Sequence, residues 1–295
     1  MSQPAADRVL RQGLGILWLL DGLLQLQPGM FTMDMISTIM QPAATGQPVW
    51  LTGLINWSIH VVTPHLVLFN WLVVILQLLT GILLLWPSER LQKDGLWLSL
   101  IWGAIVWLVG EGLGQILTGS ATFLTGAPGS AFYYALLALM LLVAGESRRG
   151  QGLNRYGSVV AASLVFAALL QLSPVFFTGL GLASPFGGAA MMQQPQFMRS
   201  MIDAVGSGVG AHAALMNVVF IAVFLALAAW LWLRPGQSGP YLATSVLLLF
   251  IWVFGQDAGM FWSGMSTDPN SAPVLALALL AAWRGRPRTW FHRGA

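Results

Sequence analysis

The chain has 295 residues, of which 57% are hydrophobic and only 8% are charged, and it contains no cysteine. An ordinary soluble domain carries about 25% charged residues, so this composition favours an all-α integral membrane protein. The absence of cysteine from the sequence excludes disulfides, iron–sulfur clusters and thiol catalysis. We interpret the net charge of +3 as a sign of orientation in a membrane, with no nucleic acid as a partner.

Apolar segments recur along the chain at nearly the ~20 residues that an α-helix needs to cross a bilayer. We expect eight transmembrane helices, over residues 9–26, 64–86, 96–117, 130–144, 157–173, 212–233, 241–262 and 272–284. The last segment is short, so we expect it to begin in the turn at 271–273 and Arg284 to reach the interface. Arg8 and Arg11 lead into the first segment without a small-residue cleavage site, unlike a cleaved signal peptide.

The positive charges predict how the chain is oriented. Twelve of the thirteen Lys and Arg residues fall on one side of this topology, and only Arg199 falls on the other. Because cytoplasmic loops carry the excess of Lys and Arg, both termini are predicted to be cytoplasmic. The sequence therefore predicts a multi-pass protein of the cell membrane.

The chain also resembles itself at an offset of about 146 residues. Residues 23–28 match 169–174, His65 and Asn70 match His212 and Asn217, and 107–128 overlays 252–273 without a gap. Four spans in each half make the two repeats parallel, related by a pseudo-twofold axis along the membrane normal. We expect repeats at 1–145 and 157–295, the second with a basic cytoplasmic tail, joined by a basic cytoplasmic linker at 146–156.

The two long loops, 27–63 and 174–211, follow the first span of each half and are rich in methionine. We expect short apolar or amphipathic helices at the outer interface here. Thioether groups also select Cu(I), which makes Met33, Met35, Met198 and Met201 candidate copper ligands. Apolar anchoring explains the same residues, and the sequence favours it.

The first span of the chain, 11–28, reads Arg, a Leu-Gly pair, apolar residues, Gly22 and then a polar residue. This segment and the second span, 71–85 with Gln77 and Gly81, resemble DoxX-like membrane proteins, which are four-helix bundles. The resemblance implies two fused DoxX-like units. It also implies a link to quinone-related redox complexes, often as a small membrane subunit.

Polar side chains within the spans lie almost entirely in their outer halves, where the rise of ~1.5 Å per residue sets their depth. These residues predict one outward-facing polar site near the axis, built from Asp21, Gln25, His65, Asn70, Glu111, His212, Asn217, Gln256 and Asp257. For the Asn and Gln residues, hydrogen bonding between helices is the favoured alternative. For the three carboxylates, function or proton handling is favoured, because a buried charge is costly in a bilayer.

A haem between His65 and His212 is disfavoured, since two histidines at regular spacing on one helix are absent. No catalytic residue is assigned, and no cofactor is required by the sequence, although a quinone or lipid could bind. The favoured function is a non-catalytic, accessory membrane subunit of a redox or respiratory complex, with the lipid bilayer and other membrane subunits as partners. The alternatives are a transporter of small molecules or ions and a quinone-reactive membrane enzyme.

Overall fold

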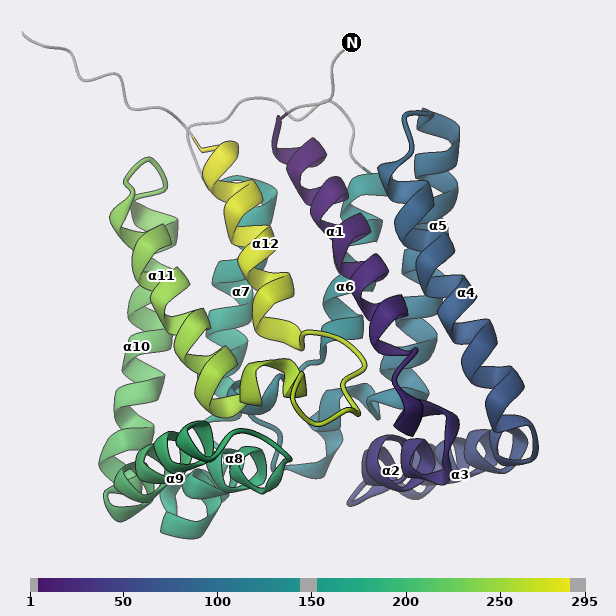
Figure 1. Ribbon diagram of the computed structural model, residues 1–295. Helices are drawn as coiled ribbons and strands as arrows, with labels where there is room; N and C mark the ends of the chain where they lie inside the picture. The colour runs from purple at the N-terminus through teal and green to yellow at the C-terminus, as the bar shows by residue number, and fades with distance from the viewer. Residues whose placement is uncertain (1–4, 144–152, 287–295) are drawn as a thin grey trace, which may run out of the picture.

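A computed structural model describes residues 5–143 and 153–286 of the protein (Figure 1). This part of the chain is helical and contains no β-strand, as the sequence predicts. Most of the predicted linker, up to residue 152, and the basic tail from residue 287 lie outside the described residues.

The helices that run side by side in Figure 1 each overlap one predicted apolar segment. They are α1 (Ala5–Leu24), α4 (Leu66–Leu85), α5 (Glu89–Ile105), α6 (Ser130–Leu142), α7 (Arg155–Leu170), α10 (Ala213–Leu233), α11 (Gly239–Phe250) and α12 (Ser271–Arg284). In the described residues, three helical stretches are long and apolar enough to cross a membrane, namely Val49–Leu85, Glu89–Gly110 and Ala213–Leu233. Eight spans therefore stay a prediction.

Two predicted spans extend too far. The segments 96–117 and 241–262 end earlier, because α5 and α11 continue only into π-helical turns, Val106–Gly110 and Ile251–Gly255. The chain then turns through left-handed backbone, with positive φ at Gly112 and Gly259. Glycine adopts this conformation without steric cost, and the left-handed residues end the helical conformation at these positions.

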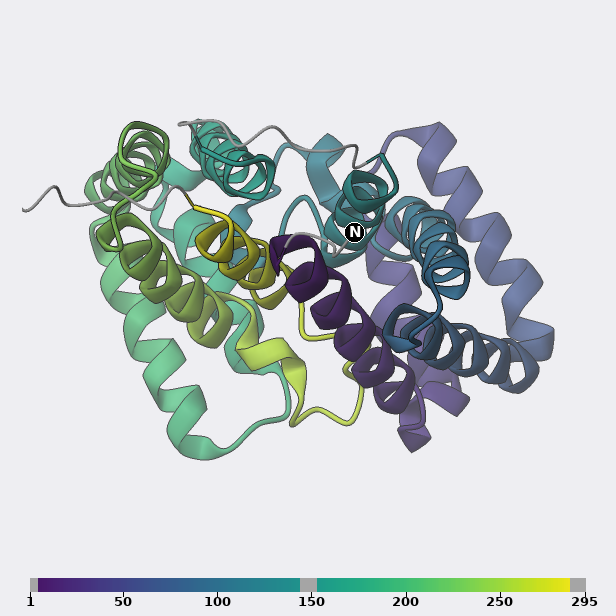
Figure 2. The ribbon, with the colours of Figure 1, turned by 90° about the horizontal axis from the view of Figure 1, so that it is seen from above.

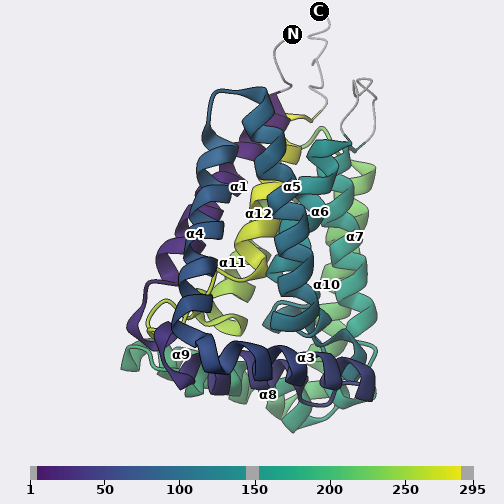
Figure 3. The same cartoon turned by 90° about the vertical axis from the view of Figure 1, so that its right-hand side faces the viewer.

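Other helices lie across one end of the helices that run side by side, here called the crosswise end (Figures 1 and 3). They are α2 (Gln41–Ala44), α3 (Val49–Val62), α8 (Gly179–Met191) and α9 (Gln196–Ala211). His65 occupies the corner between α3 and α4 with φ −125° and ψ 26°, and His212 occupies the corner between α9 and α10 with φ −127° and ψ 39°. The apolar stretch Val49–Leu85 is thus bent.

The helices pack in the same order in both halves. α1 contacts α4, α4 contacts α5 and α5 contacts α6, while α7, α10, α11 and α12 follow the same sequence of contacts. α1 also packs directly on α12, where Gly13 faces Leu277 (Figure 2). One hydrophobic core therefore includes residues of both halves, such as Leu137 and Leu275.

Each half contains a hydrogen bond from a tryptophan indole to a proline carbonyl, and the two bonds can be compared with the sequence overlay. The Trp107 indole donates to the carbonyl of Pro128 over 2.7 Å, and the Trp252 indole donates to that of Pro269 over 2.9 Å. These two hydrogen bonds pair Pro128 with Pro269, whereas the gapless overlay of 107–128 on 252–273 pairs Pro128 with Pro273. The separation of 21 residues in the first half is 17 in the second, a loop shorter by four residues.

Candidate functional site

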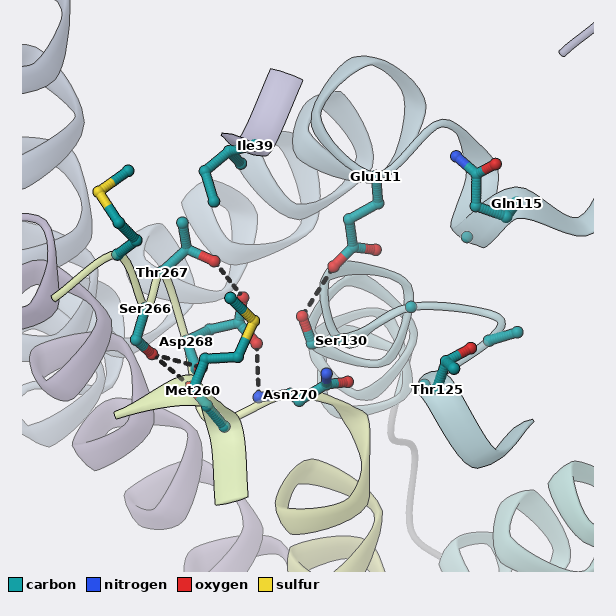
Figure 4. Close-up of a pocket in the computed structure, with 16 residues that line it drawn as sticks. Ile39, Glu111, Gln115, Thr125, Ser130, Met260, Ser266, Thr267, Asp268 and Asn270 are labelled. Carbon is teal, nitrogen blue, oxygen red and sulfur yellow. Dashed lines mark hydrogen bonds between the residues drawn. The ribbon is translucent and has the colours of Figure 1, made fainter. Parts of the chain in front are cut away.

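A cavity of about 220 Å³ lies between the loop that precedes α6 and the loop that precedes α12 (Figure 4). Both halves contribute to its wall, with Ile39 added from the methionine-rich loop. The lining residues are Ile39, Glu111, Gly114, Gln115, Thr125, Gly126, Ala127, Gly129, Ser130, Gly259, Met260, Met265, Ser266, Thr267, Asp268 and Asn270. Thr125 is exposed and marks the rim.

Glu111 follows the π-helical turn that ends α5 and reaches the first residues of α6. Its Oε1 accepts hydrogen bonds from the Ser130 hydroxyl at 2.7 Å and from the backbone N–H of Ala131 at 3.1 Å. A negative charge is favourable at a helix N-terminus, where backbone N–H groups lack partners within the helix. Oε2 has no hydrogen-bond partner and lies over Gly129, whose φ is 115°. A side chain at position 129 would occupy the place of this oxygen.

Gln256 makes the same contact in the second half, at the start of α12. Its Oε1 accepts from the N–H of Ala272 at 3.1 Å, and its Nε2 donates to the Ser271 hydroxyl at 3.1 Å. An amide is therefore sufficient to cap this helix, and the capping contact does not need a charge.

Asp21 on α1 faces Tyr134 on α6, and both residues are only 2% exposed. The Tyr134 hydroxyl is also within electrostatic reach of Glu111 and Asp268. Neither Asp21 Oδ1 nor the Tyr134 hydroxyl completes a hydrogen bond of ordinary geometry. Asp21, Glu111 and Asp268, gathered around Tyr134, form what we call the acidic cluster.

Asp268 is the member of the acidic cluster that sequence reasoning missed. Its Oδ1 accepts from the N–H of Asn270 at 2.7 Å and its Oδ2 from the Thr267 hydroxyl at 2.8 Å, so the loop holds it rigidly. The gapless overlay placed Asp268 opposite Phe123, so Asp268 had no polar counterpart in the first half. The polar run at 263–271 was the available signal.

The two predicted asparagines each donate a hydrogen bond from one helix to the end of another. Asn70 donates to the carbonyl of Gln25 at 2.9 Å, and Asn217 donates to that of Gln171 at 2.8 Å. Both carbonyls lie just after the last turn of a helix, where no helical N–H is available to them. These bonds agree with hydrogen bonding between helices. The Gln25 side chain is itself buried, and its Oε1 has no partner.

The remaining predicted site residues lie away from the cavity. His65 and His212 are exposed at the two helix corners and do not line it. Asp257 is 1% exposed, and neither of its carboxylate oxygens has a hydrogen-bond partner, but it is not in the cavity wall. Of the predicted carboxylates, Glu111 alone lines the cavity, together with Asp268; Asp21 faces Tyr134, and Asp257 and the histidines lie elsewhere.

The methionines proposed for copper do not form one group. Met35 is buried in an apolar cluster with Met30, Ile36 and other residues. Met33 and Met201 are 56% and 50% exposed, and Met198 lies with Met201 on α9, in the other half of the crosswise end. Within residues 5–143 and 153–286, no three His, Asp or Glu side chains are arranged to hold a metal ion.

Comparison with known proteins does not identify a family for this chain. No protein-family model, no curated protein and no solved structure matches the chain. The resemblance of 11–28 and 71–85 to DoxX-like proteins therefore stays a prediction from the sequence. Function has to be argued from the arrangement of the side chains.

Proposed function

We propose that the protein spans the membrane eight times, with both termini in the cytoplasm and the crosswise end outside. The overlap of each predicted segment with one of the helices that run side by side supports this topology. In this topology the exposed apolar side chains of α4 and α10, such as Leu72 and Val218, face lipid or other membrane helices. The termini and the basic tail lie on the positive, cytoplasmic side.

The two halves, in this proposal, are parallel four-helix repeats related by a pseudo-twofold axis along the membrane normal. The matched contacts of Trp107 and Trp252, and those of Asn70 and Asn217, support an origin by duplication. The common order of helix packing supports it as well. Parallel repeats follow from the even number of spans in each half.

Within the membrane, we propose that the protein is a non-catalytic, accessory subunit that assembles with other membrane proteins. The observation that carries this proposal is the use of polar residues as helix caps in both halves. Glu111 and Gln256 occupy equivalent caps although only one is an acid, which favours a framework over a catalytic centre. The resemblance to DoxX-like proteins supports a redox or respiratory complex as the assembly.

A partner subunit needs a surface on which to pack, and α4 and α10 each have an exposed apolar face. On α4, Leu68, Leu72 and Ile75 are 61%, 57% and 58% exposed. On α10, Leu215 and Val218 are 61% and 52% exposed. Lipid tails are as apolar as these side chains, so association would rest on close packing and interhelical hydrogen bonds.

Photo-crosslinking in native membranes tests this proposal. A photoreactive phenylalanine analogue placed at Leu72 on α4, or at Val218 on α10, should give a discrete protein adduct from at least one helix face. The same analogue at Trp97, exposed on α5, samples a third face and acts as a comparison. Mass spectrometry of the adduct then identifies the partner.

The alternatives give other results. A preparation without adducts that runs as a lone oligomer would contradict the accessory role and favour a transporter. A preparation that carries a quinone and turns it over would favour the enzyme. Recovery of redox-complex subunits in the adduct would support the assembly proposed here.

A further inference from the structure

We propose that a groove between α11 and α12 holds one anionic phospholipid of the cytoplasmic leaflet. An acyl chain would lie along the groove, and the phosphate would lie beside Arg284 and Arg286 at its end. The proposal rests on the topology proposed above, which places this end of the molecule on the cytoplasmic side. It goes beyond the accessory role, because a retained lipid is a ligand of the isolated protein.

The groove has a volume of about 370 Å³ and is lined by two stripes of side chains. One stripe extends over 238–245, where α11 begins, and the other over 276–283, toward the end of α12. At ~1.5 Å per residue, each stripe is about 10 Å long, which fits within one leaflet of a hydrocarbon core ~30 Å thick. Leu242 and Leu280 are 69% and 44% exposed at the edges of the groove, so a lipid can enter it from the side.

A difference between the halves explains this space between α11 and α12. In the register set by the tryptophan contacts, Gly103 on α5 corresponds to Leu248 on α11. A Cβ atom at Gly103 would lie 3.0 Å from the carbonyl oxygen of Ala131 and 3.2 Å from the amide nitrogen of Ala135, both on α6. A leucine needs more room than this, so α11 cannot approach α12 as closely as α5 approaches α6. On the cytoplasmic side of Leu248, Ala276 lines the groove with only a methyl group.

One end of the groove, here called the mouth, is positively charged. It lies where α11 begins and α12 ends, opposite the crosswise end (Figure 1). Arg284 is exposed in the last turn of α12. The guanidinium of Arg286 lies over the ring of Trp283, which lines the groove, and is within electrostatic reach of Tyr241. Guanidinium groups bind phosphate through charge-assisted hydrogen bonds.

The segments that form the mouth contain no acid to compete for these arginines. The sequence has neither Asp nor Glu in 234–245 or in 274–286. Asp7 begins α1 near the end of α12, since a Cβ at Gly285 would lie 3.2 Å from its neighbour Ala6, but Asp7 is paired with Arg155 at 2.6 Å. The cytoplasmic leaflet carries anionic lipids that are attracted to basic residues beside the membrane. An anionic headgroup therefore complements the charge of the mouth.

Two aromatic side chains mark the depth of the mouth. Tyr241 and Trp283 both line the groove, and their ring centroids are 5.2 Å apart. The Tyr241 hydroxyl donates to the carbonyl of Pro235, in the loop before α11, over 3.0 Å. Such amphipathic rings are typical of the level of the lipid headgroups. The arginines beside them are thus placed for a phosphate, and the apolar stripes for a chain.

Native mass spectrometry of the purified full-length protein in detergent tests the proposal, with phosphatidylglycerol and phosphatidylcholine of the same acyl chains as probes. We expect one phosphatidylglycerol to be retained and phosphatidylcholine to bind at least about tenfold more weakly. Arg286→Gln should weaken binding of phosphatidylglycerol about fivefold, the contribution of one arginine beside an anionic headgroup. Ala276→Phe should weaken it at least about tenfold, because the ring takes the place of the acyl chain. Both positions are half-buried, so both variants should fold.

Matched controls exist in the first half. Arg90→Gln removes an exposed arginine at the same end of the molecule, and Ala104→Phe adds the same ring at an exposed position of α5. Both should bind phosphatidylglycerol as the unaltered protein does. Weakening by a control variant equal to that by its groove counterpart would contradict the assignment to this groove.

Equal retention of the two lipids would overturn the proposal, as would retention of neither, which is the result for a groove reserved for a partner helix. Undiminished binding by the Ala276→Phe and Arg286→Gln double variant would overturn it as well. Binding in detergent does not depend on which end of the protein is cytoplasmic. Failure of the lipid site is therefore distinguishable from failure of the proposed topology, which is tested by labelling in intact cells.

Discussion

At the scale of single residues, the two oxygens of Glu111 have separate surroundings. Oε1 accepts hydrogen bonds from Ser130 and Ala131, whereas the buried Oε2 lies over Gly129 without a donor. The cap therefore comes from one oxygen, and Gln256 makes the same kind of contact with an amide oxygen. This arrangement predicts that the cap survives when the acid is replaced by an amide.

Glu111→Gln should unfold at nearly the temperature of the unaltered protein, because the amide oxygen can accept the same two hydrogen bonds. Glu111→Leu should destabilise the protein by about 1–3 kcal/mol, because it leaves the buried donors of Ser130 and Ala131 unpaired. Thermal unfolding in detergent, followed by tryptophan fluorescence, measures both. Equal unfolding temperatures for the Gln and Leu variants would show that the cap does not stabilise α6.

At the scale of elements, α1 and α4 approach each other closely through glycine. A Cβ atom at Gly81 would lie 2.7 Å from the carbonyl of Gly15 and 2.7 Å from Leu19 Cγ. The equivalent residues of α7 and α10 are Ala161 and Ala228, which are buried at 5% exposure. Small residues let membrane helices pack closely, so α1 and α4 depend on the absence of even one methyl group.

Gly81→Ala should therefore destabilise the packing of α1 on α4 by about 1–3 kcal/mol, as overpacked cores do. Gly53→Ala is the matched control, because no atom lies within 4 Å of a Cβ at this position in α3. The control should be neutral or stabilising by up to about 1 kcal/mol, since alanine favours a helix over glycine. Unfolding of both variants by a denaturing detergent provides the comparison, and equal effects would contradict the close-packing argument.

At the scale of the whole molecule, the proposed orientation places the crosswise end outside the cell. Ser120, before α6, and Ser207, on α9, are exposed at the crosswise end, whereas Ser88 is exposed at the opposite end, between α4 and α5. Because the protein has no cysteine of its own, single introduced cysteines report these positions without background.

Cysteines at Ser120 and Ser207 should react with a membrane-impermeant thiol reagent added to intact cells. A cysteine at Ser88 should react only after the membrane is opened. The extent of labelling, measured by a mass shift on a gel, checks the orientation. Labelling of the Ser88 cysteine in intact cells would contradict the cytoplasmic placement of both termini.

Some of this architecture could be predicted from the sequence and some could not. The unbroken apolar runs of α4 and α10 identified these helices, because a helix satisfies its backbone hydrogen bonds within such a run. The same hydropathy carried α5 to residue 117, because apolar composition does not register the turn after Gly110. Asp268 could not be assigned to the acidic cluster, since its place there depends on how the halves pack and on a loop four residues shorter.

A chain with two similar halves has a freedom that an assembly of two identical chains lacks. In such an assembly every substitution appears on both sides of the axis, so an acid introduced once is present twice. Here, in the register set by the tryptophan contacts, Asp268 corresponds to Ala127, and Asp21 corresponds to Ala167. Under the proposed duplication, acids are placed on one side of the molecule without repeating the cost of their burial on the other side.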